Sequence, residues 1–168
     1  GAGRKNLQER LHLNKIGRQS NTGDEELAQN IKTNSAVKGR EWVIEKPAHS
    51  MTAILCGSGP RLADNLGNIR YQASLHAKIF AMNGAAKFLS DNGLIADYQV
   101  IVDPQEATAQ LIGPAREHLF ASQCNPALFE AMPTAKLWHL ASEGIDDHLP
   151  DGTGNLTLIG GSSSVGNC

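Results

Sequence analysis

The sequence has few aromatic residues, no surplus of basic residues and no long hydrophobic run, and each shortage narrows the possible functions. Aromatic residues make up 5% of the chain, so a core would be mostly aliphatic. Fifteen basic residues stand against seventeen acidic ones, and the net charge of −2 gives no general attraction for nucleic acid. No apolar run reaches the length of a membrane span, and no segment resembles a secretion signal. We therefore expect a cytoplasmic protein without a membrane partner.

Cysteine is also scarce. Cys56, Cys124 and Cys168 are odd in number, widely spaced and without a C-x-x-C pair, which argues against a disulfide framework and against a zinc site. We expect reduced thiols, with Cys56 as an inert thiol in the core.

The length of 168 residues suits one domain, and a change in composition divides it in two. Residues 1–50 are polar and carry two short helical patterns, one of them over residues 25–31 with Asp24 as a possible cap. This segment predicts a partly helical arm that packs on the main domain or on a second subunit. Its basic residues alternate with Asn, Gln and Glu, which favours a solvated helix face over a nucleic-acid contact.

Residues 51–168 read as alternating strands and helices. The expected strands are residues 51–56, 77–82, 98–102, 118–122, 135–140 and 155–159, and the expected helices are residues 60–66, 85–89, 106–111 and 126–131. Such alternation with short connections predicts an α/β fold: a Rossmann-like, doubly wound, mostly parallel sheet covered on both faces. Ligands of such sheets bind at the carboxyl ends of the strands, where the strand order reverses.

The last strand opens into a glycine and serine turn, yet the sequence stops at Cys168, before the next helix could complete two turns. We expect a domain truncated at its C-terminus. The sheet face left uncovered there, or the N-terminal arm, is a possible homo-oligomer contact.

The sequence organises around an apolar run that ends in Gly57, Ser58, Gly59 and Pro60. This pattern predicts a buried strand, a tight turn and the start of a helix, where an anion such as a phosphate can bind. A dinucleotide fingerprint is not supported, because Leu62 replaces the third glycine and the expected acid is absent. No G-K-[ST] or G-x-S-x-G motif follows the turn. The alternative interpretation is a tight connection without a ligand.

Polar residues follow the other predicted strands. Asp103 could hold Mg²⁺ or a substrate hydroxyl, or it could simply initiate the turn at Pro104. Asn83 could bond a base or a sugar, or cap the helix that follows. The last turn could present backbone N–H groups and hydroxyls to a phosphate, or cap a helix; its residues are Gly160, Gly161, Ser162, Ser163 and Ser164. His139, within a predicted strand, is expected to be packed or hydrogen-bonded rather than catalytic.

Five short motifs together resemble the hydroxymethyl-dihydropterin diphosphokinase MptE-like family, which includes flagellin-modification and phage-encoded members. They are Gly57-Ser58-Gly59-Pro60-Arg61-Leu62, Asn83-Gly84-Ala85, Gly93 with Ala96-Asp97-Tyr98, Asp103, and Gly160-Gly161-Ser162 to Val165. The resemblance covers residues 51–168 and leaves residues 1–50 outside. Members of the family usually have serine where this chain has Arg61, and proline where it has Ala96. An arginine at that position could itself reach a phosphate.

The resemblance implies a nucleotide-binding transferase that moves a diphosphate from ATP to a small alcohol with Mg²⁺. Carried onto this chain, it surrounds the phosphate with Gly57, Ser58, Gly59 and Arg61, sets Asn83 near the base or ribose, and completes the crevice with Gly160, Gly161 and Ser162 to Ser164. Asp103 would hold the metal or the acceptor. The G-x-G-P turn also resembles that of bacterial sialyltransferases, so a CMP-sugar glycosyltransferase is the alternative. A non-enzymatic phage or assembly factor that keeps the fold is a third hypothesis.

Overall fold

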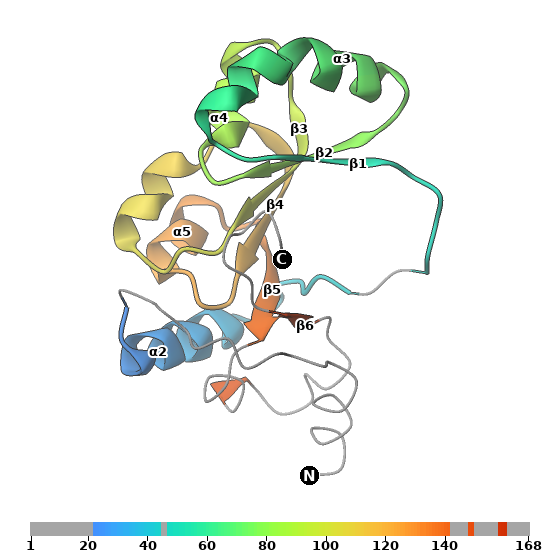
Figure 1. Cartoon of the computed structure of the whole chain (residues 1–168). Helices are drawn as coiled ribbons and strands as arrows, with labels where there is room; N and C mark the ends of the chain where they lie inside the picture. Colours follow the sequence, from blue (N-terminus) through green and yellow to red (C-terminus); the bar gives the residue numbers. More distant parts are fainter. Residues whose placement is uncertain (1–21, 45–46, 142–147, 150–157, 161–168) are drawn as a thin grey trace.

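A computed structural model of the chain describes residues 22–44, 47–141, 148–149 and 158–160 (Figure 1). Six parallel strands form its sheet: β1 (Ala53–Cys56), β2 (Lys78–Met82), β3 (Ala96–Ile101), β4 (Ala115–Ala121), β5 (Lys136–Ala141) and β6 (Leu158–Gly160). The strands follow one another across the sheet in chain order. The predicted α/β fold with a parallel sheet is confirmed, but no reversal of strand order occurs between the described strands, so the ligand position expected at such a reversal is not found among them.

Short helices connect these strands: η1 (Pro60–Asn65), α3 (Leu66–Ser74), α4 (Ala85–Asp91), η2 (Glu106–Leu111) and α5 (Pro126–Ala131). The helix predicted to close at Gly67 instead passes through it, because η1 leads directly into α3. In α5, the Asn125 side chain accepts a hydrogen bond from the Ala127 amide at 3.0 Å, and Pro126 occupies the first turn, as helix-start chemistry predicts. Among the described helices, none has the length and apolar sequence needed to cross a lipid bilayer.

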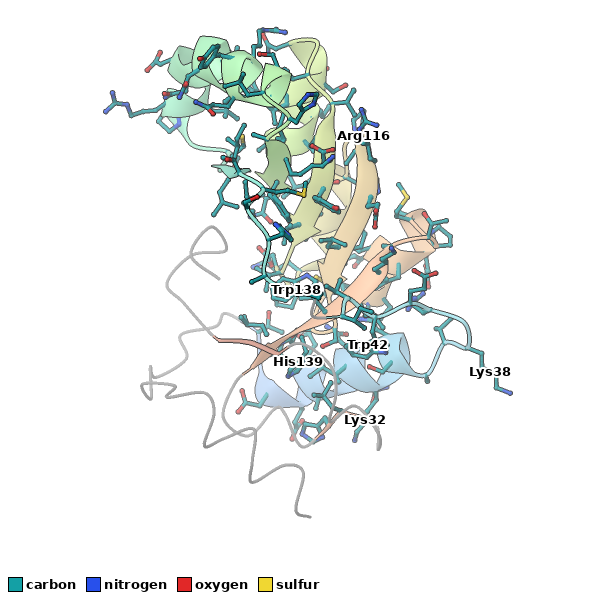
Figure 2. The ribbon with its side chains drawn as sticks, turned by 90° about the vertical axis from the view of Figure 1, so that its right-hand side faces the viewer. Lys32, Lys38, Trp42, Arg116, Trp138 and His139 are labelled. Carbon is teal, nitrogen blue, oxygen red and sulfur yellow. The ribbon has the colours of Figure 1, made fainter. Side chains whose placement is uncertain are left out.

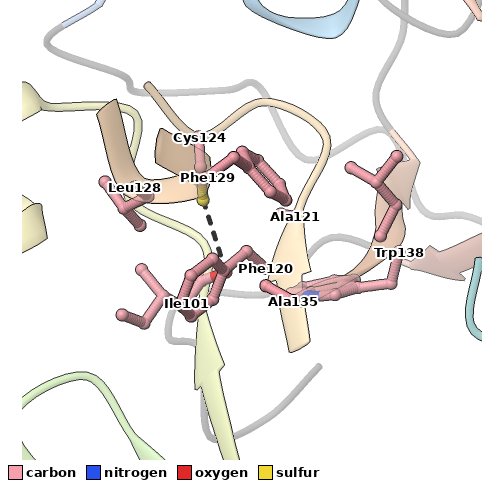
Figure 3. Packing of buried hydrophobic residues seen from close by; sticks show 9 residues of the cluster. Ile101, Phe120, Ala121, Cys124, Leu128, Phe129, Ala135 and Trp138 are labelled. Carbon is pink, nitrogen blue, oxygen red and sulfur yellow. Dashed lines mark hydrogen bonds between the residues drawn. The ribbon is translucent and has the colours of Figure 1, made fainter. Parts of the chain in front are cut away.

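The core is divided between two clusters along the sheet. One contains Phe120, Phe129 and Trp138 around β4, β5 and α5, with the Phe120 and Phe129 rings edge to face at 5.6 Å between centroids (Figure 3). The other is built of smaller side chains around β1, β2 and α4, such as Ala81 and Leu89. Burial of aliphatic and aromatic surface is the main stabilising term for both clusters.

The helix predicted within the N-terminal segment, α2 (Asp24–Ser35), packs on the main domain. Its Leu27 and Ile31 are buried, and the half-buried Trp42 packs against them. The backbone on both sides of Trp42 bonds to Leu137, which pairs this segment with β5 in parallel. Figure 2 shows Trp42 above α2 and beside β5. The helix N-cap is Gly23 rather than the expected Asp24.

Asn34 attaches α2 to the loop that follows β4. Its side-chain Nδ2 donates to the carbonyls of Ser122 at 3.0 Å and Cys124 at 2.7 Å, and all three residues are buried. Such bonds cannot be replaced by water without opening the contact between helix and loop.

Replacing Asn34 by alanine is expected to lower the free energy of unfolding by about 2–3 kcal/mol, because two buried carbonyls lose their donors. Urea denaturation of the original chain and of the Asn34→Ala variant measures the difference in free energy of unfolding. The exposed neighbour Thr33 is the control, and Thr33→Ala should change stability by about 0.5 kcal/mol or less. If Asn34→Ala changed stability as little as Thr33→Ala, α2 would not be part of the cooperative domain.

Candidate functional site

The ends of β1, β2 and β3 bring three of the predicted site segments side by side. Cys56 of β1 pairs with Ala81 of β2, so Gly57 follows opposite the last residue of β2. The Asn83 amide donates to the Val100 carbonyl of β3 at 3.0 Å. Asp103 comes two residues after the end of β3. Because the strands are parallel and about 4.8 Å apart, these residues share one edge of the sheet.

Gly57 and Gly59 lie in the turn of residues 57–59, here called the glycine turn, and nothing in the fold explains why either is glycine. A Cβ atom built on either would meet no atom of the described residues within 4 Å, and neither residue has the positive φ that favours glycine. Both glycines and Ser58 are exposed, and no described group accepts a hydrogen bond from their amide N–H groups. The turn therefore offers open space and free donors to a ligand that approaches the backbone closely.

Asn83 borders the glycine turn in an unusual state. Its φ of 50° lies in the left-handed region, which Asn tolerates better than most residues. The residue is half-buried, and its side-chain Oδ1 is a buried acceptor to which no described group donates a hydrogen bond. A buried unpaired acceptor costs free energy in the unliganded protein. The predicted helix cap is not formed, because the N-cap of α4 is Gly84 and no side chain caps it.

Gln99 supports Asn83 from within the sheet, and the sequence analysis did not single it out. Its Nε2 donates to the carbonyls of Asn83 and Leu111, both at 2.8 Å, and its Oε1 accepts from the Gly113 amide at 3.1 Å. The side chain is fully buried. It thus fixes the end of β2 relative to the end of η2. A polar residue in the middle of an apolar strand was the available signal.

Asp103 initiates the turn at Pro104, which was the structural alternative to a role in binding Mg²⁺ or substrate. Its Oδ1 accepts a hydrogen bond from the Gln105 amide at 3.0 Å, which initiates the turn after β3. The residue is half-buried. Within the part of the chain that the structure describes, no three His, Cys, Asp or Glu side chains converge as a metal cluster. One carboxylate can still hold Mg²⁺ when the phosphates of a nucleotide supply further ligands.

Arg61 is the second residue of η1, one position after Pro60. Its side chain is exposed and forms no hydrogen bond or ion pair with a described group, whereas its carbonyl accepts from Asn65 Nδ2 at 2.8 Å. The guanidinium is therefore available to an anion bound at the glycine turn.

The last predicted segment is not part of this group. Gly160 belongs to β6, which is five strands away from β1 in the sheet order. Five spacings of about 4.8 Å put roughly 24 Å between the two strands. Gly160 therefore does not share a crevice with Gly57. Gly161, Ser162, Ser163 and Ser164 lie outside the described residues.

Two buried thiols and one buried histidine remain: Cys56 directly precedes the glycine turn, Cys124 follows β4, and His139 lies in β5. Burial raises the pKa of the Cys56 thiol and that of the Cys124 thiol, which agrees with inert cysteines. Cys124 Sγ donates to the Ile101 carbonyl (Figure 3). His139 is fully buried, with Nδ1 2.7 Å from Ser122 Oγ, so the prediction of a hydrogen-bonded strand histidine is confirmed.

Comparison with known proteins agrees with this architecture. One solved structure, that of the MAf glycosyltransferase from Magnetospirillum magneticum AMB-1, has a TM-score of 0.56 at 18% sequence identity. The match covers 79% of this chain and 24% of that protein, so this chain spans about a quarter of its length. At this identity the likeness shows the fold. No protein with a curated description matches the chain.

The model of the 6-hydroxymethylpterin diphosphokinase MptE-like family matches residues 25–168. The match begins earlier than the expected residue 51, at the helix α2 that packs on the sheet. It extends from there over the glycine turn, Asn83 and Asp103. The chain, with its transferase-like α/β domain, belongs to the 6-hydroxymethylpterin diphosphokinase MptE-like family.

Proposed function

We propose that this chain forms the nucleotide-binding part of a transferase, in which the glycine turn holds a phosphate group and Asn83 holds the ribose or base. In the form we favour, a diphosphate passes from ATP to a small alcohol. The family to which the chain belongs, named for a diphosphokinase, supports this form. Transfer of this kind depends on positioning and on neutralisation of the phosphate charge more than on covalent chemistry by the protein.

The observation that carries the proposal is the buried Oδ1 of Asn83 beside an open turn. Among the described residues this acceptor has no partner, and the N–H groups of the glycine turn, which follows the neighbouring strand, have no acceptor there either. A ribose hydroxyl or a base N–H would satisfy the acceptor, while a phosphate oxygen would satisfy the donors. One nucleotide supplies both kinds of group.

Charge neutralisation would come from Arg61 and from Mg²⁺ at Asp103. The Arg61 side chain is unpaired among the described groups and follows the turn by two residues. Asp103 retains carboxylate lone pairs beyond the hydrogen bond from Gln105, so it fits as one protein ligand of a nucleotide-bound magnesium ion. The metal would stabilise the negative charge that develops on the transferred group.

The alternative is a glycosyltransferase that uses a CMP-sugar. Its support is the fold shared with the MAf glycosyltransferase. This form also requires the glycine turn to hold a phosphate group, because a CMP-sugar carries one. A third form, a non-enzymatic assembly factor, would keep the fold without binding a nucleotide.

Calorimetric titration of the chain with ATP, CMP and UDP, each with and without Mg²⁺, separates these forms. Binding of ATP that strengthens with Mg²⁺ supports the diphosphokinase form. Preferential binding of CMP supports the glycosyltransferase form. Lack of binding to all three nucleotides overturns the proposal.

Replacing Asn83 by glycine is expected to weaken nucleotide binding about tenfold, because the ligand loses one hydrogen bond made in a buried place. Stability should not fall, since glycine adopts positive φ freely and the substitution removes a buried unpaired acceptor. Titration calorimetry and thermal melting measure the two effects. Reduced stability with unchanged affinity would show that Asn83 has only a structural role.

A further inference from the structure

A concave site lies at the opposite end of the sheet from the glycine turn. It is an open pocket of about 490 Å³ at the amino ends of β2, β3 and β4, here called the amino-end pocket. Lys78 begins β2, and Asp97 and Arg116 are the second residues of β3 and β4. The volume lies within the range of small-molecule sites.

Asp97 organises two cations at this pocket. Its Oδ2 accepts from the Ile79 amide at 3.0 Å, and its Oδ1 lies 3.1 Å from Lys78 Nζ and 3.7 Å from Arg116 Nε. Burial raises the pKa of the Asp97 carboxyl, but the hydrogen bonds from Ile79 and Lys78 and the charges of Lys78 and Arg116 outweigh this effect and lower the pKa. The carboxylate is therefore ionised at neutral pH and holds both cations in place.

The two cations keep donors that no described group uses. Lys78 Nζ makes one of its three possible hydrogen bonds, and Arg116 faces Asp97 through Nε, which leaves its terminal N–H groups unpaired among the described residues. The Arg116 side chain is 75% exposed (Figure 2). Two cations and one carboxylate leave a net charge of +1 in the pocket. A single negative charge would balance it.

Apart from His76, the other side chains that line the pocket are apolar. They include Ala73, Leu94, Met51 and Ile95, and the last two are each about half exposed. Met51 is 52% exposed and lies two residues before β1, and Ile95 is 50% exposed and directly precedes β3. A ligand with an apolar body would remove this surface from water, at a gain of about 25 cal/mol for each Å² buried.

We propose that the amino-end pocket binds a small carboxylate with an apolar body. The carboxylate would accept hydrogen bonds from the Arg116 terminal N–H groups and from Lys78 Nζ, while the body would contact Met51 and Ile95. Arginine presents a planar pair of donors that matches a carboxylate. The pocket lies at the far end of the strands from the glycine turn, so the proposal is independent of the nucleotide site.

Hexanoate, hexanol and acetate are suitable probes, because they separate the charge from the apolar body. Titration of the isotope-labelled chain, followed through backbone amide resonances, should show hexanoate shifting Ile79, Ile95 and Asp97, with weaker effects of hexanol and of acetate. Equal effects of hexanoate and hexanol, or shifts that lie elsewhere, would overturn the proposal.

The variant Arg116→Gln should weaken hexanoate binding about tenfold, since a charge-assisted hydrogen bond is lost. Ile95→Ser should weaken hexanoate binding, because the apolar body of the ligand loses a contact, and should leave the response to acetate unchanged. Both side chains are exposed, so the fold should persist, and thermal melting checks it. Lys38→Gln, at an exposed cation far from the pocket in Figure 2, is the matched control and should not change binding. If Lys38→Gln reduced binding as much as Arg116→Gln, the effect would be one of net charge and the proposed site would be wrong.

Discussion

Replacing Gln99 by leucine should lower the free energy of unfolding by about 3–5 kcal/mol, the largest effect on stability that we expect from one side chain. Leucine fills a similar volume, but the carbonyls of Asn83 and Leu111 and the amide of Gly113 would all lose their buried partner. Each group left unsatisfied in a buried position costs about 1–3 kcal/mol. Chemical denaturation measures the change.

Gln29 is a matched control for this experiment. It is a glutamine with a side-chain hydrogen bond to Thr33, but it is exposed on α2, so Gln29→Leu should change stability by about 0.5 kcal/mol or less. A cost below about 1 kcal/mol for Gln99→Leu would show that water or a small shift of the backbone replaces the three hydrogen bonds. The end of β2 would then be less firmly placed than the structure indicates.

Replacing Gly57 by alanine should weaken nucleotide binding about a hundredfold and leave stability nearly unchanged. The new methyl group meets no atom within 4 Å in the part of the chain that the structure describes, so the described fold accepts it. It would occupy the space through which a phosphate reaches the backbone N–H groups of the glycine turn. Loss of about two such hydrogen bonds corresponds to roughly 2.7 kcal/mol, or a hundredfold in the dissociation constant.

Gly113 provides the opposite case and serves as the control. A Cβ atom there would lie 2.6 Å from the Lys87 backbone nitrogen, so Gly113→Ala should cost about 1–3 kcal/mol of stability through overpacking. Glycine is thus required at position 113 by the packing of the fold, whereas at position 57 we expect it to be required by the ligand. Nucleotide affinity that survives Gly57→Ala would contradict the proposed role of the turn.

Several of the strands could be predicted from the sequence because each is a short run of mostly apolar residues, and β1 and β2 end directly before Gly57 and Asn83. β2 and β5 were found within about one residue of their observed bounds for this reason. Helix ends were less certain: Gly67 has the residue type of a helix stop, yet it lies in α3, because a glycine can remain in a helix when the neighbouring turns continue. The spacing of apolar residues does not show whether a helix stops at such a glycine or continues through it.

The arrangement of the strands and the support of the site could not be predicted. Strand order depends on contacts between distant segments, so the separation of Gly160 from Gly57 across the sheet became visible only in the structure. Asn34 and Gln99 appear in the sequence as ordinary polar residues, and only their backbone partners show that they hold elements together. Gly57 and Asn83, in contrast, follow neighbouring strands at the same edge of the sheet, as expected of residues at the carboxyl ends of β1 and β2.

The proposed function requires above all that a nucleotide binds at the glycine turn and Asn83. Titration of the isotope-labelled chain with ATP and Mg²⁺, followed through backbone amide resonances, tests it most directly. We predict the largest saturable shifts at Gly57, Ser58, Gly59, Arg61 and Asn83. Shifts confined to the amino-end pocket, or no saturable shift at any of these residues, would contradict it.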